Sequence, residues 1–301
     1  ASALGTNTTG ANNVAIGVNA LLVNTTGDRN VAVGEFALDA NTTANANTAI
    51  GYNALTSNTT GTENTSVGLA SLEANTTASY NTALGSGALQ DNVTGSNNTA
   101  LGRNALRDNL GSNNTGVGMN VMERMTTGDS NTAMGQNALF ANTTGQYNTA
   151  IGRQALDANT TASGNTALGY TALSAVETNT GLTAIGYRAL AVSNGGNNNT
   201  AVGYNAGVVM TTGGQNVMMG VNTLLSLTTG SNNVAIGHQA LEDITTNGGC
   251  TAVGYQALLD NTQSNNTALG YQALRLNTTG ANNVAVGLQA GNVNTTGSQN
   301  T

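Results

Sequence analysis

The amino-acid sequence predicts an all-β protein, a parallel β-solenoid of about seventeen coils. A unit of seventeen residues recurs along the chain, every copy contains a short aliphatic run that ends in glycine, and an asparagine precedes nearly every run. A fixed period this short is typical of solenoids, in which each repeat contacts mainly its neighbours. We therefore expect residues 1–301 to form a single repetitive domain.

The period can be measured on the glycine that ends each aliphatic run, which we call the marker glycine. Two copies lack one residue, and we expect an altered turn or a kink in them, near Leu110–Gly111 and near Thr262–Gln263. The other intervals are all seventeen residues. The marker glycines are Gly17, Gly34, Gly51, Gly68, Gly85, Gly102, Gly118, Gly135, Gly152, Gly169, Gly186, Gly203, Gly220, Gly237, Gly254, Gly270 and Gly287.

Each copy contains a candidate strand directly before its marker glycine. Reading toward the glycine, the run is Thr or Val, then a small residue that is usually Ala, then an aliphatic residue. Such β-branched runs bounded by Asn and Gly are typical of short strands. A second strand is predicted around the Ala-Leu pair that follows, as at Ala54–Leu55, and the Asn-Thr-Thr-Gly passage predicts a turn. A seventeen-residue unit with these turn residues leaves little room for a helix.

An asparagine precedes the Thr or Val position in fifteen of the seventeen copies, and Leu182 and Cys250 stand there in the other two. Stacked coils repeat about every 4.8 Å, so these amides should lie above one another and form hydrogen bonds along the stack, as amide ladders do in cross-β structures. The first members of this predicted ladder are Asn13, Asn30, Asn47, Asn64, Asn81 and Asn98.

The strand pattern also predicts association of chains. Alternate side chains of a strand point to opposite faces, so Thr48 and Ile50 share one face and Ala49 and Gly51 share the other. Both faces are small or apolar, as in strands that are covered on both sides. We expect the aliphatic residues to belong to the core and the narrow Ala/Gly face to approach a second and a third chain, which predicts a homotrimer around a common axis.

Both chain ends fall inside a repeat. Residues 3–10 are in register with residues 20–27, which places residue 1 within a coil, and Asn300 and Thr301 begin a further copy. Because solenoids have atypical terminal caps, we expect the chain to be a segment of a longer fibre or a unit that continues end to end.

Composition argues against several functions. The chain has no Lys, seven Arg and a net charge of -7, whereas nucleic-acid binding needs concentrated positive charge. No apolar run is long enough to cross a membrane. We expect no cofactor, no metal site and no enzymatic activity. The acids are scattered, the only histidine, His238, stands at a variable outer position, and Cys250 has no basic neighbour to activate it.

The stretch Asn12–Gly34, NNVAIGVNALLVNTTGDRNVAVG, resembles the head repeats of trimeric autotransporter adhesins, and the resemblance extends along the whole chain. Similar NTAxGxxAL repeats occur in phage tail fibres and other bacterial surface fibres. The resemblance implies a left-handed parallel β-roll, three of which pack into a trimer, and an extracellular location on a cell surface or a virion. The period of seventeen is longer than is usual in that family, and its neck, stalk and membrane anchor are absent from these residues.

Two functions follow as hypotheses. The first is a structural shaft or head of an extracellular fibre, with outer residues that contact a receptor or glycan. Six tyrosines directly after marker glycines are the candidate contacts: Tyr52, Tyr170, Tyr187, Tyr204, Tyr255 and Tyr271. The alternative is an ice-binding solenoid that uses Thr arrays, since Thr-Thr recurs in most copies. Against this alternative, the Thr-Thr pairs lie in a turn, and the Thr row at Thr48 alternates with aliphatic residues predicted to be core.

Overall fold

The computed structural model describes residues 2–301; Ala1, which the sequence places within a coil, lies outside the described residues. All regular elements are three-residue strands, and no helix occurs in the described range. The strands are β1 (Val14–Ile16), β2 (Val31–Val33), β3 (Thr48–Ile50), β4 (Thr65–Val67), β5 (Thr82–Leu84), β6 (Thr99–Leu101), β7 (Thr115–Val117), β8 (Thr132–Met134), β9 (Thr149–Ile151), β10 (Thr166–Leu168), β11 (Thr183–Ile185), β12 (Thr200–Val202), β13 (Val217–Met219), β14 (Val234–Ile236), β15 (Thr251–Val253), β16 (Thr267–Leu269) and β17 (Val284–Val286).

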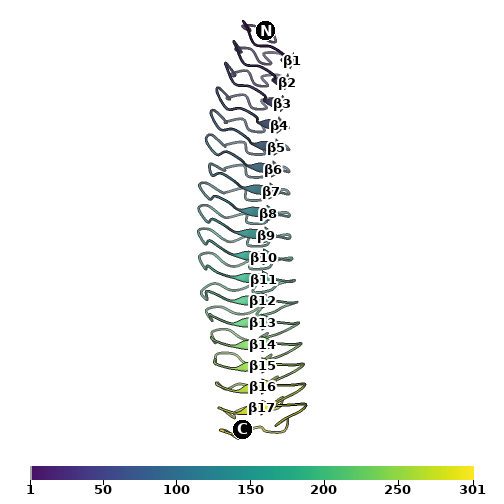
Figure 1. The fold of residues 1–301 in the computed structure, drawn as a ribbon, viewed down its shortest axis with the longest axis vertical. Helices are drawn as coiled ribbons and strands as arrows, with labels where there is room; N and C mark the ends of the chain where they lie inside the picture. The colour runs from purple at the N-terminus through teal and green to yellow at the C-terminus, as the bar shows by residue number, and fades with distance from the viewer. Residues whose placement is uncertain (1) are drawn as a thin grey trace. The chain divides into compact units, whose positions relative to one another are not determined.

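The chain divides into two compact units, residues 1–148 and 149–301. In the first unit, β1 to β8 form a parallel sheet in which each strand pairs with the next one along the chain (Figure 1). In the second unit, β9 to β17 are arranged in the same way. Equivalent residues pair, as Thr48 does with Thr65, so each unit is a β-solenoid with one strand per coil. The predicted all-β parallel solenoid is confirmed.

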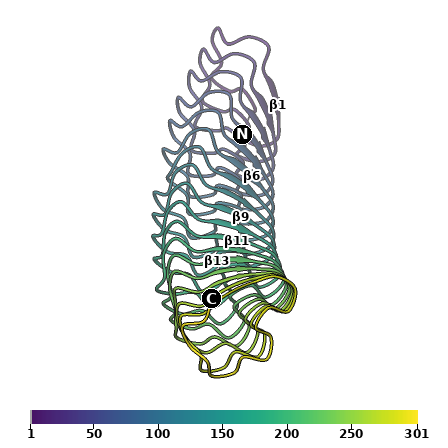
Figure 2. The same ribbon diagram turned by 60° about the horizontal axis from the view of Figure 1, so that its bottom comes forward.

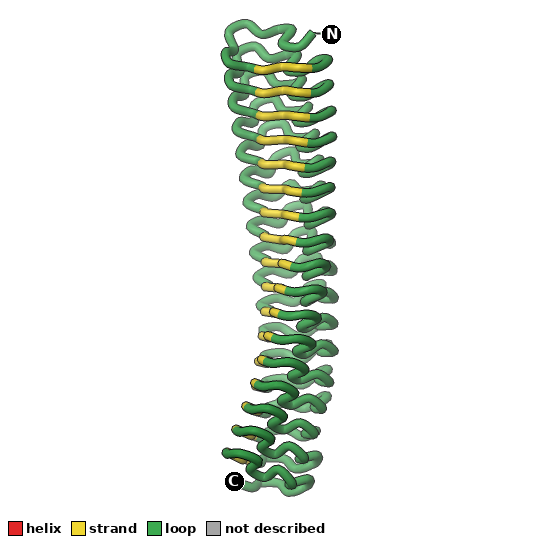
Figure 3. Tube along the Cα trace, turned by 90° about the vertical axis from the view of Figure 1, so that its right-hand side faces the viewer, coloured by secondary structure: helices red, strands yellow, loops and turns green. Residues whose placement is uncertain are grey.

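The predicted second strand is wrong. Ala54–Leu55 lies in a turn, and in each coil only the run before the marker glycine is a strand (Figure 3). Leu55 has φ of 54°, a left-handed conformation that costs a non-glycine residue roughly 1–2 kcal/mol. The side chain is fully buried, which contributes about 1.5–3 kcal/mol and offsets the strain. The turn still joins the next coil, because the Leu55 N–H donates to the Ser71 carbonyl at 3.0 Å.

The core of each unit lies inside its coils, which have nearly the same outline from one coil to the next, as the last coils of the second unit show in Figure 2. The middle residue of each strand points inward, so Ala49 is fully buried, and Leu55 enters the same core from the turn. The prediction that the Ala/Gly face meets another chain is therefore wrong, as is the prediction that the aliphatic strand residues are core. Ile50, on the opposite face from Ala49, points outward and is 39% exposed.

The marker glycine is required by both conformation and space. Gly51 has φ of 137°, which side-chain-bearing residues rarely adopt. A Cβ placed on it would lie 2.4 Å from the Gly68 carbonyl oxygen of the next coil. Successive coils can therefore approach each other at this corner only through glycine.

The predicted asparagine ladder is buried and connects coil to coil. The Asn47 side chain accepts the backbone N–H of Asn64 at 3.0 Å through Oδ1 and donates to the Gly61 carbonyl at 2.8 Å through Nδ2. An amide-to-amide bond from Asn64 to Asn47 is longer, at 3.2 Å. The ladder thus satisfies buried backbone groups more than it pairs amides with one another. Asn13, Asn30, Asn81 and Asn98 make equivalent bonds.

A second asparagine ladder, not predicted from the sequence, runs through the Asn-Thr-Thr-Gly turns. Asn58 donates to the Asn41 side chain at 3.1 Å and to the Gly61 carbonyl three residues on at 2.9 Å. Here the amides do pair with one another, and they close the turn at the same time. The recurring Asn that opens each Asn-Thr-Thr-Gly passage was the available signal for this ladder.

The two short copies shorten this turn. Asn109 donates to the Gly111 carbonyl only two residues on, at 2.8 Å, and Asn261 does the same to Gln263 at 2.7 Å. Strand register is kept, since Thr99 still pairs with Thr115. The altered turns are found where the sequence predicts them, and the missing residue is absorbed without disturbing the sheet.

Removing one amide of the first ladder should destabilise the fold. In Asn81→Ala, the backbone N–H of Asn98 loses its buried acceptor, and the Gly95 carbonyl keeps only its bond from the Asn92 amide. We expect a loss of about 2–4 kcal/mol in the free energy of unfolding, measured by chemical denaturation. Ser86→Ala, at an exposed position after a marker glycine, is the control. Equal stability of the two variants would show that the ladder contributes little.

Candidate interaction surface

The outward face of the strands is the candidate functional site. It consists of two parallel rows, the Thr or Val that begins each strand and the aliphatic residue that ends it, and we call it the outer strand face. Several of its large side chains are 43–49% exposed: Leu84 and Met134 in the first unit, and Leu168, Met219 and Leu269 in the second. The alternation of the strand produces the rows, because the small middle residue takes the inward position.

No strand contains a charged residue, so the outer strand face is uncharged along both units. Soluble monomers rarely expose a continuous apolar patch of more than a few hundred Å². An aliphatic side chain in every coil, in line with those of the coils before and after, makes such a patch. This face is therefore able to bind another surface that is flat and without charge.

The threonines of the outer strand face lie beside the aliphatic row. Thr65, Thr82, Thr115 and Thr132 are exposed, and each stands one coil from an equivalent Thr or Val of its unit. The Thr-Thr turns differ, because the first hydroxyl is used within the fold: Thr25 donates to the Thr42 carbonyl at 3.1 Å. The ordered, solvent-facing Thr array is thus the one on the strands.

Five of the six candidate tyrosines form stacks in the second unit. Tyr170, Tyr187 and Tyr204 stack with centroid distances of 5.3 and 5.1 Å. His238 precedes Tyr255 and Tyr271 in a second stack, with distances of 5.4 and 5.1 Å. In the first unit, Tyr52 instead meets Phe36 edge-on at 6.1 Å.

This stacking limits what the tyrosines can contact. Within a stack, each ring covers the face of its neighbour, since the planes of Tyr187 and Tyr204 differ by only 8°. Ring edges and hydroxyls remain open, because the side chains are still about two-fifths to one-half exposed. The stacks can therefore offer hydroxyls and edges to a partner, but not the open ring faces on which sugars stack.

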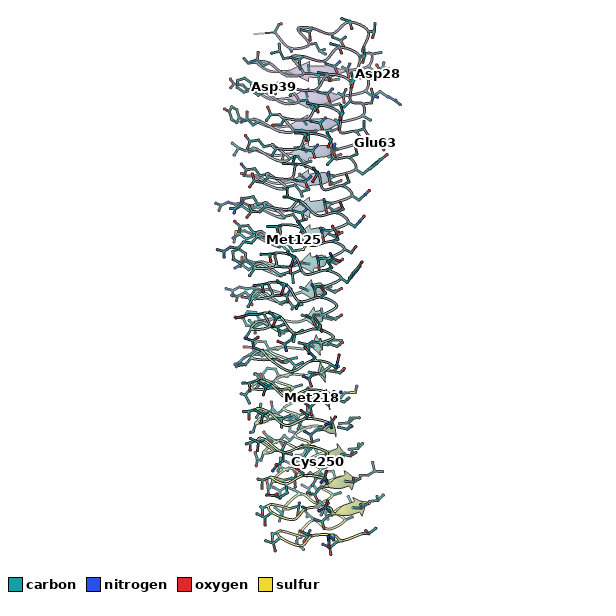
Figure 4. The ribbon with its side chains drawn as sticks, turned by 90° about the vertical axis from the view of Figure 1, so that its left-hand side faces the viewer. Asp28, Asp39, Glu63, Met125, Met218 and Cys250 are labelled. Atoms are coloured by element: carbon teal, nitrogen blue, oxygen red, sulfur yellow. The ribbon has the colours of Figure 1, made fainter. Side chains whose placement is uncertain are left out.

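Charged side chains meet around Arg107, which pairs with Asp108 at 2.7 Å and with Glu123 at 2.5 Å. In Figure 4, Asp28, Asp39 and Glu63 lie at the outer edges of their coils, whereas Met125, Met218 and Cys250 lie in the interior. Within residues 2–301, no group of three or more His, Cys, Asp or Glu is placed to hold a metal ion. Burial raises the pKa of the Cys250 thiol, which keeps it protonated.

Comparison with known proteins adds no family. The chain matches no protein-family model, and no curated protein matches it. No helix in the described part of the chain is long and apolar enough to cross a membrane.

Acid should stabilise this protein. Burial raises the pKa of Asp91, Asp157, Glu242 and Asp243, and nearby carboxylates add to the effect at all of these except Asp157. A raised pKa in the folded chain means that folding favours the protonated form, so stability grows as the pH falls through these pKa values and is lost as the pH rises. We expect a higher thermal midpoint at about pH 4, near the ordinary carboxyl pKa values, than at about pH 7.

The matched variant for this effect is Asp157→Asn, which removes one of the four groups. It should show a smaller gain on acidification than the unaltered chain. A midpoint that falls steadily from neutral to acid pH would contradict the assignment.

The tyrosine stacks should contribute to stability in proportion to the neighbours that each ring has. Tyr187 stacks on two rings and Tyr271 on one. We expect Tyr187→Ser to lower the free energy of unfolding by about 1–2 kcal/mol and Tyr271→Ser by about half as much. Urea denaturation of the two variants measures this. Equal losses would mean that stacking is not the source of the effect.

Proposed function

We propose that this chain is a segment of an extracellular fibre in which three copies, each wound as a left-handed β-roll, associate through their outer strand faces, and that its role is mechanical. The observation that carries the proposal is the uncharged row of outward-facing aliphatic side chains, one in every coil of each unit and each either half-buried or exposed. A surface of this kind is stable in water when it is covered, and identical copies offer an identical flat, apolar surface.

The mechanical role is supported by the way each unit is built. Parallel strands in register connect every coil of a unit to the next, and the buried asparagine ladders add to most of these connections, so the unit has few places where it can open locally. The likeness of the repeats to those of trimeric autotransporter heads and phage tail fibres favours the same reading. An adhesive role belongs to the proposal as well, and the edges and hydroxyls of Tyr170, Tyr187 and Tyr204 are the groups that would contact a receptor or glycan.

Light scattering on the purified chain tests the association. We expect three times the 30.0 kDa chain mass, and the double variant Leu84→Asp, Leu168→Asp should shift it to one chain mass. Charged groups buried at an interface without partners are strongly unfavourable. The fold should be kept, because both side chains point outward.

The control places the same charges elsewhere. Thr43 and Thr161 are exposed at turns, so Thr43→Asp, Thr161→Asp should remain trimeric. A single-chain mass for the unaltered protein at all concentrations would overturn the proposed association.

The second candidate function, ice binding, is favoured by one finding. The aliphatic residues that argued against it lie on the surface, so the strands present Thr and aliphatic side chains together in a regular, uncharged array. This function requires the outer strand face to be free. A single-chain mass together with thermal hysteresis, abolished by Thr82→Tyr, Thr132→Tyr, would support ice binding, and absence of hysteresis would exclude it.

A further inference from the structure

Two turns of the second unit carry the same chemically sensitive sequence. Asn-Gly-Gly occurs at Asn194–Gly196 and at Asn247–Gly249, and Asn-Gly occurs nowhere else in the chain. Glycine after asparagine leaves the backbone nitrogen unobstructed by a Cβ, so this nitrogen can reach the side-chain amide of the asparagine. The two segments stand at different places in the repeat. Asn194 is eight residues after its marker glycine, and Asn247 is ten residues after.

Asn194 is exposed and free to react. It occupies the place of the first Thr in the Asn-Thr-Thr-Gly turn. In the next coil the residue at this place is Thr211, whose hydroxyl donates to the Thr228 carbonyl at 3.0 Å. The Asn194 side chain makes no such bond to any described residue, and neither does the backbone N–H of Gly195. Both the amide that would be attacked and the nitrogen that would attack it are therefore unengaged.

The turn around Asn194 also lacks the amide that anchors most other turns. Ser193 stands where the second asparagine ladder would have its Asn, and its buried hydroxyl has no hydrogen-bond partner among the described residues. The backbone N–H of Asn194 still donates to the Thr211 carbonyl at 3.1 Å. The segment is thus held by its main chain and by the Asn199 amide, which donates to the Gly196 carbonyl at 3.3 Å, while the side chains of Ser193 and Asn194 add no bond.

Asn247 is engaged at both of the groups that would react, although Ile244 replaces the ladder asparagine in its turn too. Its Nδ2 donates to the Thr262 carbonyl, and its own carbonyl accepts the Asn233 amide at 3.3 Å. The N–H of Gly248 donates to the Ser264 hydroxyl at 3.4 Å. The Gly214 N–H makes the equivalent bond to the Ser231 hydroxyl. Attack by the Gly248 nitrogen on the Asn247 side chain would require these bonds to break.

We propose that Asn194 is a site of spontaneous deamidation and that Asn247 is protected from it by its place in the repeat. The Gly195 nitrogen loses its proton to hydroxide and attacks Cγ of Asn194. An N–Cγ bond forms, the Cγ–Nδ2 bond breaks, and ammonia leaves after taking up a proton. Water then opens the resulting cyclic imide at either carbonyl, which yields aspartate or isoaspartate without any oxidation or reduction.

The product changes the coil in two ways. A carboxylate replaces a neutral amide, which adds one negative charge to a chain whose net charge is already -7. Isoaspartate also inserts an extra carbon into the main chain, beside the N–H that bonds to Thr211 of the next coil. Modification at Asn194 therefore weakens the contact between these two coils.

Peptide mapping by mass spectrometry tests the proposal, because both Asn-Gly-Gly sites are present in one sample. The full folded chain is incubated at mildly alkaline pH, and conversion to aspartate or isoaspartate is followed at Asn194 and Asn247. We expect Asn194 to convert at least about fivefold faster, the factor that one ordinary hydrogen bond contributes to an equilibrium. Equal rates, or faster conversion at Asn247, would overturn the proposal.

Two controls separate structure from local sequence. In the urea-denatured chain the two sites should convert at similar rates, because both are Asn-Gly-Gly, and a persistent difference there would contradict a structural cause. Asn194→Thr restores the residue found in most turns and should abolish conversion in that peptide. Continued mass gain in the same peptide of this variant would place the reaction at another residue.

Discussion

The structure depends on the stacking of identical coils in register. A coil of seventeen residues with a three-residue strand cannot satisfy its own backbone, and each coil obtains its partners from the next. The first asparagine ladder shows this dependence most clearly, since Asn47 accepts the N–H of Asn64, which begins the next copy, and donates to the carbonyl of Gly61, fourteen residues along the chain. Buried polar groups without partners are costly, so the amide is stable inside the fold only because the sequence repeats.

The same stacking sorts residues between core and surface. The corner at Gly51 and the small residue at Ala49 let the coils close around a core of Ala and Leu, which leaves Thr48 and Ile50 outside. Once one coil is arranged in this way, the others of its unit follow in register, and a single exposed aliphatic residue becomes a continuous row. The candidate interaction surface is thus a direct consequence of the repeat, and an assembly of copies is the proposal that accounts for its lack of charge.

The sequence was sufficient to predict the parallel solenoid, the strand before each marker glycine, the first asparagine ladder and the altered turns of the short copies, because each is fixed by periodicity and by residue type. It was not sufficient to decide which strand face is core. Ala49 and Ile50 are both apolar, and the choice depends on the space inside the coils. Where the large Met218 takes the inward position, Gly207 replaces the buried leucine of the preceding coil, and a Cβ there would lie 2.5 Å from the Met218 sulfur. The left-handed conformation of Leu55 was also beyond prediction, since its strain is offset only by tertiary burial.

The most direct test of coil-to-coil stacking is amide hydrogen exchange resolved at single residues. The backbone N–H groups of Asn64 and Asn81 donate to side-chain oxygens of the first ladder. They should exchange as slowly as the N–H of Thr65, which donates to the Asn81 carbonyl at 2.8 Å within the sheet. The N–H of the exposed turn residue Thr43 should exchange far faster. Exchange at Asn64 and Asn81 as rapid as at Thr43 would contradict the account, because it would show that the ladder does not hold the coils together.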